Sequence, residues 1–308
     1  MIYELSLSHI SVVAPLFKDV WIDKALIDSA IEGSHPARVF VDNVYQPKAT
    51  LMCCERGDYF VIGAPRPGPI RQFIKDMPSE ADVFNRERFA YFMPEIAWEV
   101  ALIEDYGGHV PIFPTRSFRY SHATIKPLVE WRKALRYDAF VRRIDATLLE
   151  KIDRGIVRTV TEFSRDELNR IFQDSFGFCI ITGDEIASVA WAFALSSKYA
   201  AVSIDTAEPF RRRGFATLAC VAFIEHCLAH RLTAIWNCLA SNIASAATAL
   251  KLGMEEGPAQ RESAWRPVWK HVQTTKGLWT KGENATSMPI GTIIWRRRNE
   301  RSSSCEFA

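Results

Sequence analysis

One stretch of the chain has the residue types and the order of a phosphate-binding loop. An apolar, strand-like run ends at Thr206, and a short polar loop with Arg211–Arg213 and Gly214 leads directly into a long apolar helix. Backbone N–H groups at a helix N-terminus point at a bound phosphate, and the helix dipole favours its negative charge. Gly214 lacks a Cβ, so the backbone can approach the phosphate closely. The stretch predicts a pyrophosphate site; the alternative is a solvated basic loop in front of a helix.

A second segment continues the pattern and weakens that alternative. A strand-like run from Ala234 to Cys238 precedes Asn242, which begins a helix that ends at Gly253, eleven residues later. The Arg-x-x-Gly-x-Ala motif alone would be weak. With a strand before it, a helix after it and the second segment in register, it is considerably more specific.

With these two segments the chain resembles the Gcn5-related N-acetyltransferase (GNAT) superfamily. The loop matches the superfamily's Arg/Gln-x-x-Gly-x-Gly/Ala signature, and Asn242 with Gly253 matches its second CoA-contacting segment. The resemblance is strong over about residues 150–270 and fainter over the N-terminal half. Within the superfamily the chain is similar to the zwittermicin-A-resistance group. The stretches that carry this closer similarity are Phe176–Cys179, Ile204–Thr206, Arg213–Thr217 and Trp236–Cys238.

The resemblance implies direct transfer of an acetyl group from acetyl-CoA, a co-substrate, to an amine. It also implies that the strands ending at Thr206 and Cys238 splay apart, with the pantetheine arm between them. The acceptor would be an amine of a small molecule, such as an antibiotic or a metabolite. The residues expected to bind acetyl-CoA are Thr206, Arg211, Arg212, Arg213, Gly214, Phe215, Ala216, Thr217, Asn242 and Ser245.

The catalytic groups are less evident in the sequence. Many GNAT enzymes place a tyrosine seven residues after the asparagine as proton donor to the thiolate, and this chain has Ala249 there. Asp205 is the candidate base that takes the proton of the amine, directly or through water. Its alternative is a structural carboxylate that binds nearby backbone or an arginine. Asn237 and Cys238 could line the cleft, but Cys238 has no activating base near it in sequence and is a poor nucleophile candidate.

Two other functions stay open. Ala249 and the lack of an unmistakable base are also compatible with a non-catalytic acyl-CoA-binding module, which would bind CoA without turnover. Tandem GNAT architecture also occurs in aminoacyl-tRNA-dependent peptide-bridge enzymes. Those enzymes need no CoA phosphate loop, so the intact segment from Arg211 to Thr217 argues against that reading.

Composition limits the classes of protein. No run approaches about 18 consecutive apolar residues, and the start lacks a basic segment followed by an apolar one, so neither a membrane span nor a secretory signal is expected. Seven cysteines without Cys-x-x-Cys spacing indicate reduced thiols in the cytoplasm and no metal site. The net charge of +2 gives no reason to expect nucleic-acid binding. Nothing in the sequence indicates an oligomeric state.

The expected fold class is α/β (α+β), a mixed and mostly antiparallel sheet flanked by helices. Residues 1–145 contain three short strands at about 38–41, 49–53 and 58–62 and two helical stretches at about 16–31 and 94–103. We interpret this half as a degenerate GNAT-like copy without its own CoA loop; the alternative is an unrelated α+β cap. Residues 146–275 form the CoA-binding domain, with a last strand at 265–272. Residues 276–308 are expected to be a basic, disordered tail.

Overall fold

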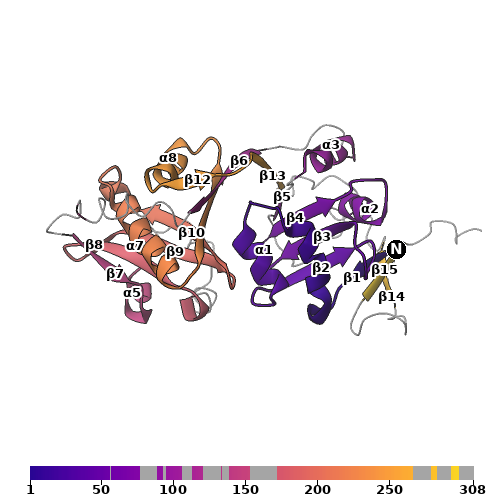
Figure 1. The fold of residues 1–308 in the computed structure, drawn as a ribbon, viewed down its shortest axis with the longest axis horizontal. Coiled ribbons are helices and arrows are strands. Elements are labelled where there is room, and N and C mark those ends of the chain that lie inside the picture. Colours follow the sequence, from indigo (N-terminus) through magenta and orange to yellow (C-terminus); the bar gives the residue numbers. More distant parts are fainter. Residues whose placement is uncertain are drawn as a thin grey trace, which may run out of the picture. The chain divides into compact units, whose positions relative to one another are not determined.

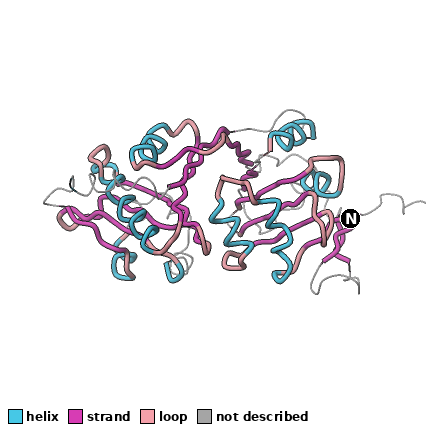
Figure 2. Tube along the Cα trace, viewed as in Figure 1, coloured by secondary structure: helices cyan, strands magenta, loops and turns pink. Residues whose placement is uncertain are grey.

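The protein is described by a computed structural model over residues 1–55, 57–76, 89–92, 95–105, 113–120, 133, 139–152, 172–265, 279–282 and 293–297. Its contacts divide the chain into two units whose elements are shown in Figures 1 and 2. Unit 1 comprises Met1–Val20, Ala30–Phe113 and Gln260–Ala308. Unit 2 comprises Trp21–Ser29 and Pro114–Ala259. Both units are therefore discontinuous in sequence.

Unit 1 has a mixed sheet in the order β14-β15-β1-β2-β3-β4-β5-β13. Its strands are β1 (Ile2–Glu4), β2 (Ala37–Val41), β3 (Ala49–Cys54), β4 (Asp58–Gly63), β5 (Phe89–Phe92), β13 (Gln260–Trp265), β14 (Trp279–Gly282) and β15 (Ile293–Arg297). Its helical elements are the 3-10 helix η1 (Leu7–Phe17), α2 (Pro69–Asp76) and α3 (Ile96–Asp105). The three strands predicted for the N-terminal half are confirmed as β2, β3 and β4.

Unit 2 has a mixed sheet in the order β6-β11-β10-β9-β8-β7, with β12 paired to β6. Its strands are β6 (Phe113–Tyr120), β7 (Ala139–Arg143), β8 (Gly177–Thr182), β9 (Glu185–Leu195), β10 (Tyr199–Thr206), β11 (Thr233–Leu239) and β12 (Met254–Glu256). Its helices are α5 (Ala146–Lys151), η4 (Glu208–Phe210), α7 (Phe215–Ala229) and α8 (Ile243–Lys251). The helix α1 (Lys24–Ile31) begins in the segment assigned to unit 2.

The two units repeat one strand order. In unit 1, β1 to β4 pair antiparallel in sequence, and β5 then adds parallel to β4 after the crossover helix α2. In unit 2, β7 to β10 pair antiparallel in the same way, and β11 adds parallel to β10 after α7. This shared order confirms the predicted fold class and favours a degenerate copy over an unrelated cap.

Each face of the unit 2 sheet is covered. The helix α7 packs across β8, β9 and β10, as Figure 1 shows, and its side chains join a large apolar cluster with Phe118 and Trp236. The helix α5 lies on the opposite face, where Leu148 joins a second cluster with Cys179 and Trp191. Strand residues alternate between these faces because successive side chains of a strand point to opposite sides.

Two elements differ from the sequence-based expectation. The helix predicted over 16–31 is instead the end of η1 and the separate helix α1, because the chain leaves η1 after Phe17 and Asp23, directly before α1, adopts a positive φ of 43°. The strand β13 runs over Gln260–Trp265 and pairs antiparallel with β5, a partner far away in sequence. It meets the strand predicted over 265–272 only at Trp265, and residues 266–272 lie outside the described residues.

The expected disordered tail contains two strands. β14 and β15 pair with each other, and β15 also pairs antiparallel with β1, with Ile2 opposite Trp295. The apolar run at Ile293–Trp295 thus finds a partner at the edge of the unit 1 sheet, so these stretches are not a disordered tail. The domain boundaries at 145 and 275 stay predictions, and the two units show that the contacts do not follow them as contiguous blocks.

Candidate functional site

The loop between β10 and α7 has a defined, strained backbone. After η4, Arg212 and Gly214 both adopt left-handed conformations, with φ of 61° and 82°. Glycine takes this conformation readily, whereas a side chain makes it costly for Arg212. Strain of this kind persists only where the surrounding structure maintains it, and it is frequent at ligand-binding loops. The loop predicted to bind phosphate is therefore a turn with a specific backbone conformation.

The first turn of α7 offers unused backbone donors. Gly214 is the N-cap, no side chain caps the helix, and the Gly214 carbonyl accepts the first helical bond from the Leu218 N–H at 3.1 Å. The N–H groups of Phe215, Ala216 and Thr217 precede that bond and have no acceptor within the helix. An anion at this end would accept from them and would lie at the positive end of the helix dipole. These residues fit a pyrophosphate.

The three arginines of the loop are all exposed but differ in their contacts. Arg211 donates through Nε to the Thr206 carbonyl at 3.2 Å, and the Arg213 guanidinium lies 5.5 Å from the centroid of the Phe210 ring. Arg211 therefore ties the loop to the end of β10 with one of its five donors. The arginine positions surround the α7 N-terminus with positive charge.

The strands β10 and β11 separate toward their C-terminal ends. Within their described residues they pair only where Tyr199–Ala201 faces Thr233–Ile235. Beyond that point β11 pairs with β6 and β10 pairs with β9 alone. The β10–β9 ladder has a register shift between Ala201 and Val202, where the two parallel strands part, and such a bulge bends a strand. This is the splay that the resemblance implies.

Asp205 and Thr206 are held together at the end of β10. Asp205 Oδ1 accepts from the Thr206 backbone N–H at 3.0 Å. Ser188 Oγ donates to the Asp205 carbonyl at 2.9 Å and lies 2.8 Å from Thr206 Oγ1. Because Ser188 has a single proton, Thr206 is the donor between the two hydroxyls. The Thr206 N–H, hydroxyl and carbonyl are thus all engaged, the carbonyl by Arg211.

This network bears on both roles predicted for the pair. A ligand oxygen that accepted from the Thr206 N–H would compete with the Asp205 carboxylate for it. Val202 and Ile204 pack beneath α7, so Asp205 faces the opposite side of the sheet, beside the gap between β10 and β11. That position suits a base, while the bond to Thr206 suits a structural carboxylate, and both interpretations stay predictions.

Asn242 and Ser245 lie at the start of α8 and have structural contacts of their own. Asn242 Oδ1 accepts from the Ser245 N–H at 3.2 Å and caps the helix. Ser245 Oγ accepts from Trp236 Nε1 at 2.9 Å, which fixes α8 to β11. Since β10 and β11 are parallel, the N-termini of α7 and α8 follow the same edge of the sheet. The structure thus brings the two predicted CoA segments to that edge.

No proton donor stands at the position usual for the tyrosine, because Ala249 is fully buried in the cluster beneath α7 and α8. Burial raises the pKa of the neighbouring Cys238 thiol, although a hydrogen bond with Ser245 and the charge of Arg116 oppose the shift. Cys238 therefore stays protonated near neutral pH and does not act as a thiolate nucleophile.

Sequence reasoning missed a contact from the N-terminal end of the chain. Asp23, which is buried, accepts from Asn237 Nδ2 at 2.7 Å. The segment Trp21–Ser29 that carries it is part of unit 2. It is fitted closely, because a Cβ on Gly257 would lie 2.2 Å from the Trp21 ring. No signal in the sequence indicated this contact, because Asp23 lies within the helical stretch expected over 16–31.

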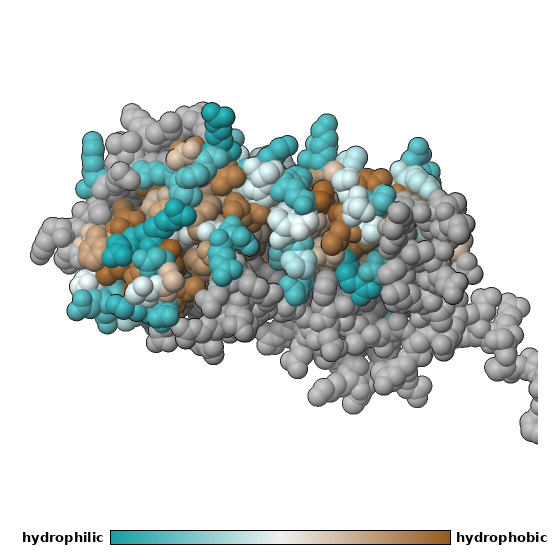
Figure 3. All heavy atoms as spheres, turned by 90° about the horizontal axis from the view of Figure 1, so that it is seen from below, coloured by the Kyte–Doolittle hydropathy of each residue, from teal (hydrophilic) through white to brown (hydrophobic). Residues whose placement is uncertain are grey.

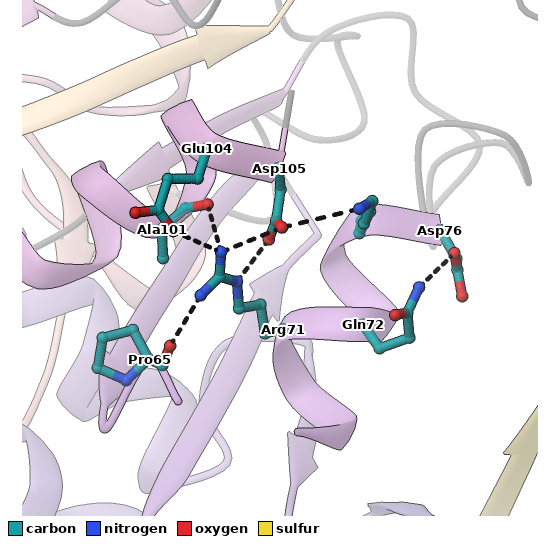
Figure 4. Close-up of polar contacts among 8 residues, drawn as sticks. Pro65, Arg71, Gln72, Asp76, Ala101, Glu104 and Asp105 are labelled. Atoms are coloured by element: carbon teal, nitrogen blue, oxygen red, sulfur yellow. Dashed lines mark hydrogen bonds and ion pairs between the residues drawn. The ribbon is translucent and has the colours of Figure 1, made fainter. Parts of the chain in front are cut away.

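The corresponding loop of unit 1 lacks the donors of an anion site. Between β4 and α2, residues 65, 67 and 69 are prolines without a backbone N–H. Arg71 of α2 turns to α3, donating to Asp105 at 2.7 Å and to Glu104 at 2.9 Å (Figure 4). The hydrogen bond to Asp105 raises the pKa of Arg71 despite the cost of burial. The cation in the first turn of α2 is thus neutralised within the unit.

A tryptophan also occupies the space beside the parallel strands of unit 1. Trp98 of α3 is fully buried, and its indole N–H donates to the Gly63 carbonyl, at the end of β4, at 2.7 Å. Among the described residues, β4 and β5 pair only from Asp58 to Phe60 with 90–92, so Gly63 lies past that paired part. The indole therefore contacts the C-terminal end of β4, past the part that pairs with β5.

Unit 2 also has a cavity of about 490 Å³ beside the loop that follows β10. Its lining mixes apolar and charged side chains, among them Phe140, Leu148, Ile186, Phe210, Arg142 and Lys151. Figure 3 shows such a mixture of brown and teal surface on the body at the left, which is unit 2. Among the described residues, Asp205, Thr206 and Asn237 are not part of this lining, so the cavity is separate from the gap between β10 and β11.

The described residues contain neither a group of metal-binding side chains nor a membrane-spanning helix. Within the described ranges, no group of three or more His, Cys, Asp or Glu side chains could hold a metal ion. None of the helices among those residues is long and apolar enough to cross a membrane.

Comparison with known proteins identifies the relatives of this arrangement. A family model described as GNAT acetyltransferase matches residues 14–258. The chain is 23% identical over 262 residues to YdfB of Bacillus subtilis (strain 168), an uncharacterized N-acetyltransferase, with 83% of this chain and 95% of that protein covered.

Solved structures agree on the fold. A GCN5-related N-acetyltransferase-like protein from Streptococcus suis 89/1591 is similar with a TM-score of 0.63 at 24% identity, covering 84% of this chain and 99% of the other. A tandem GNAT protein from the clavulanic acid biosynthesis pathway has a TM-score of 0.63 at 11% identity, covering 87% and 98%. At sequence identities of 24% and 11%, the structural similarity shows that the fold is shared and nothing more.

Proposed function

The chain belongs to the GNAT acetyltransferase family, and on this premise we propose that it moves an acetyl group from acetyl-CoA to an amine of a small molecule. The observation that carries the proposal is the loop from Arg211 to Thr217. It combines two left-handed residues with a first helical turn whose N–H groups lack helical acceptors, next to two parallel strands that separate. These are features that a pyrophosphate and a narrow acyl arm require.

The residues of the site have separate roles in binding and in catalysis. The α7 N-terminus and the arginine rim bind the phosphates, while Asn242 and Ser245 support the second helix beside the gap. The Thr206 N–H is the donor for the carbonyl oxygen of the acyl group, on which negative charge develops as the amine attacks. Asp205, released from that N–H, takes the proton of the amine. No tyrosine protonates the departing thiolate, and a CoA thiol is acidic enough to leave without one.

The proposed class of acceptor is based on a family resemblance and on the names of similar proteins. The chain is similar to the zwittermicin-A-resistance group, and a relative in Bacillus subtilis is named as an N-acetyltransferase. A structural neighbour acts in clavulanic acid biosynthesis. An amine carried by an antibiotic or a related metabolite is the acceptor that these relationships favour.

The test is a screen of amines with acetyl-CoA and detection of the released thiol. Turnover that requires both acetyl-CoA and a primary amine supports the proposal. Saturable binding of acetyl-CoA without thiol release for any amine would contradict it. That outcome would favour the second candidate, a non-catalytic acyl-CoA-binding module, which the buried Ala249 and the engaged Asp205 also allow.

A further inference from the structure

Two buried polar atoms lie opposite each other in the unit 2 sheet without a hydrogen-bond partner. They are Ser117 Oγ on β6 and Asn237 Oδ1 on β11. The two residues are direct partners in the antiparallel ladder, which places their Cβ atoms about 5 Å apart. Their neighbours Phe118 and Trp236 pack beneath α7. Both polar side chains therefore point to the other face of the sheet.

The Asp23 carboxylate borders the same place. The carboxylate accepts a hydrogen bond from Asn237 Nδ2 at 2.7 Å. This bond orients the amide group, and the amide oxygen Oδ1 is the atom without a hydrogen-bond partner. Leaving buried acceptors unpaired costs folding free energy, and native proteins nearly always pair them with protein, water or a ligand. Here a carboxylate, an amide oxygen and a hydroxyl meet, so the place is rich in acceptors.

We propose that Asp23, Ser117 and Asn237 bind the ammonium group of the acceptor, which is a primary amine; this inference rests on the proposed function. A primary ammonium has three N–H donors and no acceptor, which complements a carboxylate, an amide oxygen and a hydroxyl. Asn237 faces the same side of its strand as Asp205 does on β10, across the gap between the strands. The amine would thus be held on the face that carries the candidate base.

Two cations near this place, Lys24 and Arg119, have contacts of their own. Lys24 forms an ion pair with Asp28 one helical turn later, and the Arg119 guanidinium lies 4.0 Å from the Trp21 ring centroid. Burial lowers the pKa of Arg119, while the charges of Tyr199 and Asp28 oppose the shift. Asp28 thus pairs with Lys24 and its charge acts on Arg119, while Asp23 accepts from Asn237.

The experiment follows the side-chain amide signal of Asn237 by NMR in the full chain, with methylammonium as the probe. The signal is identified by its loss in Asn237→Leu. We expect a saturable shift with methylammonium and none with tetramethylammonium, which has the same charge but no N–H donor. Ser117→Ala and Asp23→Asn each weaken methylammonium binding about tenfold, as for one lost hydrogen bond. Asp28→Asn, the matched control on the same segment, leaves the affinity unchanged.

Stability separates this site from a structural water. Removal of an unpaired buried hydroxyl leaves the melting temperature of Ser117→Ala equal to that of the wild type or higher. A lower melting temperature together with unchanged methylammonium affinity would mean that a water bridges the two atoms, and would overturn the proposal. Equal responses to methylammonium and tetramethylammonium would overturn it as well.

The two proposals fail in different ways. If methylammonium binds as described but no amine is acetylated, the ammonium site stands and the acetyltransferase proposal fails. If amines are acetylated and neither Ser117→Ala nor Asp23→Asn changes KM for the amine, the enzyme stands and the ammonium site is wrong.

Discussion

Trp98 and Ser245 occupy the same position in the two units, since each is the third residue of the helix that follows the parallel strand. The helices also begin alike, with Ile-Ala before each residue. The Trp98 indole reaches the Gly63 carbonyl, whereas the Ser245 hydroxyl accepts from Trp236. A large, fully buried side chain thus stands in unit 1 at the helix position that a small one has in unit 2.

Replacing that tryptophan should cost stability without creating a second site. Trp98→Ser removes a fully buried side chain and its hydrogen bond, and should lower the free energy of unfolding by about 3–5 kcal/mol. Urea denaturation measures this loss. Val100→Ser, half-exposed on the same helix, is the control and should change it little. Calorimetric titration should still give one acetyl-CoA per chain, because three prolines leave the loop before α2 poor in donors. A stoichiometry of two would contradict this.

The phosphate loop can be tested at Gly214. In Gly214→Asp, a carboxylate faces the pyrophosphate and a Cβ is forced into a left-handed conformation, so acetyl-CoA binding should be mostly lost. Isothermal titration calorimetry measures the affinity. Gly183→Asp is a matched control, since Gly183 also has a positive φ and a Cβ there would meet nothing within 4 Å. Equal affinities of the two variants would show that the loop is not the site.

Asp205 can be tested with a variant that keeps its hydrogen bond. Asparagine retains an oxygen that can accept from the Thr206 N–H but carries no charge. If Asp205 is the base, Asp205→Asn should lower kcat about 100-fold at neutral pH with acetyl-CoA affinity nearly unchanged. The loss should shrink as the pH rises, because more of the amine is then neutral. A loss that does not depend on pH and comes with a lower melting temperature would favour the structural carboxylate.

A pH effect on stability should come from His226. Burial lowers the pKa of His226 from 6.5 to about 4, aided by the charges of His230 and Arg143. Between about pH 6.5 and 4, His226 therefore binds a proton in the unfolded chain but not in the native one. The contribution of His226 to stability is complete above about pH 6.5 and falls as the pH drops toward 4. The loss should be on the order of 1 kcal/mol, as solvent screening reduces it. Urea denaturation at pH 7 and 5 should show a smaller difference in His226→Gln. An unchanged difference would assign the effect elsewhere.

The C-terminal strands should stabilise unit 1. Removing residues 279–308 takes β15 away from β1 and should lower the melting temperature by at least about 3 °C, equivalent to roughly 1 kcal/mol. Removing residues 298–308 alone leaves both strands in place and should have little effect. Melting temperatures from calorimetry decide between them. Identical values for the two truncations would restore the expectation of a dispensable tail.

Local patterns explain why much of unit 2 could be predicted. Gly214 marked the start of α7, and the apolar run that ends at Thr206 marked β10. The site geometry that local patterns could not give depends on distant partners. β6 inserts between β11 and β12, and Asp23 meets Asn237, only because unit 2 takes chain from both halves. Asp23 lay within an expected helix, where a local pattern cannot indicate a contact across the fold.

The contact between Asp23 and Asn237 joins residues 214 positions apart. During synthesis at about 5–20 residues per second, the aspartate waits roughly 10–40 seconds before its partner is made. For that time Trp21 also lacks Gly257. The segment that carries Trp21 and Asp23 therefore completes these contacts only after β11 and Gly257 have been synthesised. Unit 2 thus cannot acquire its full set of contacts while the chain is shorter than about five sixths of its length.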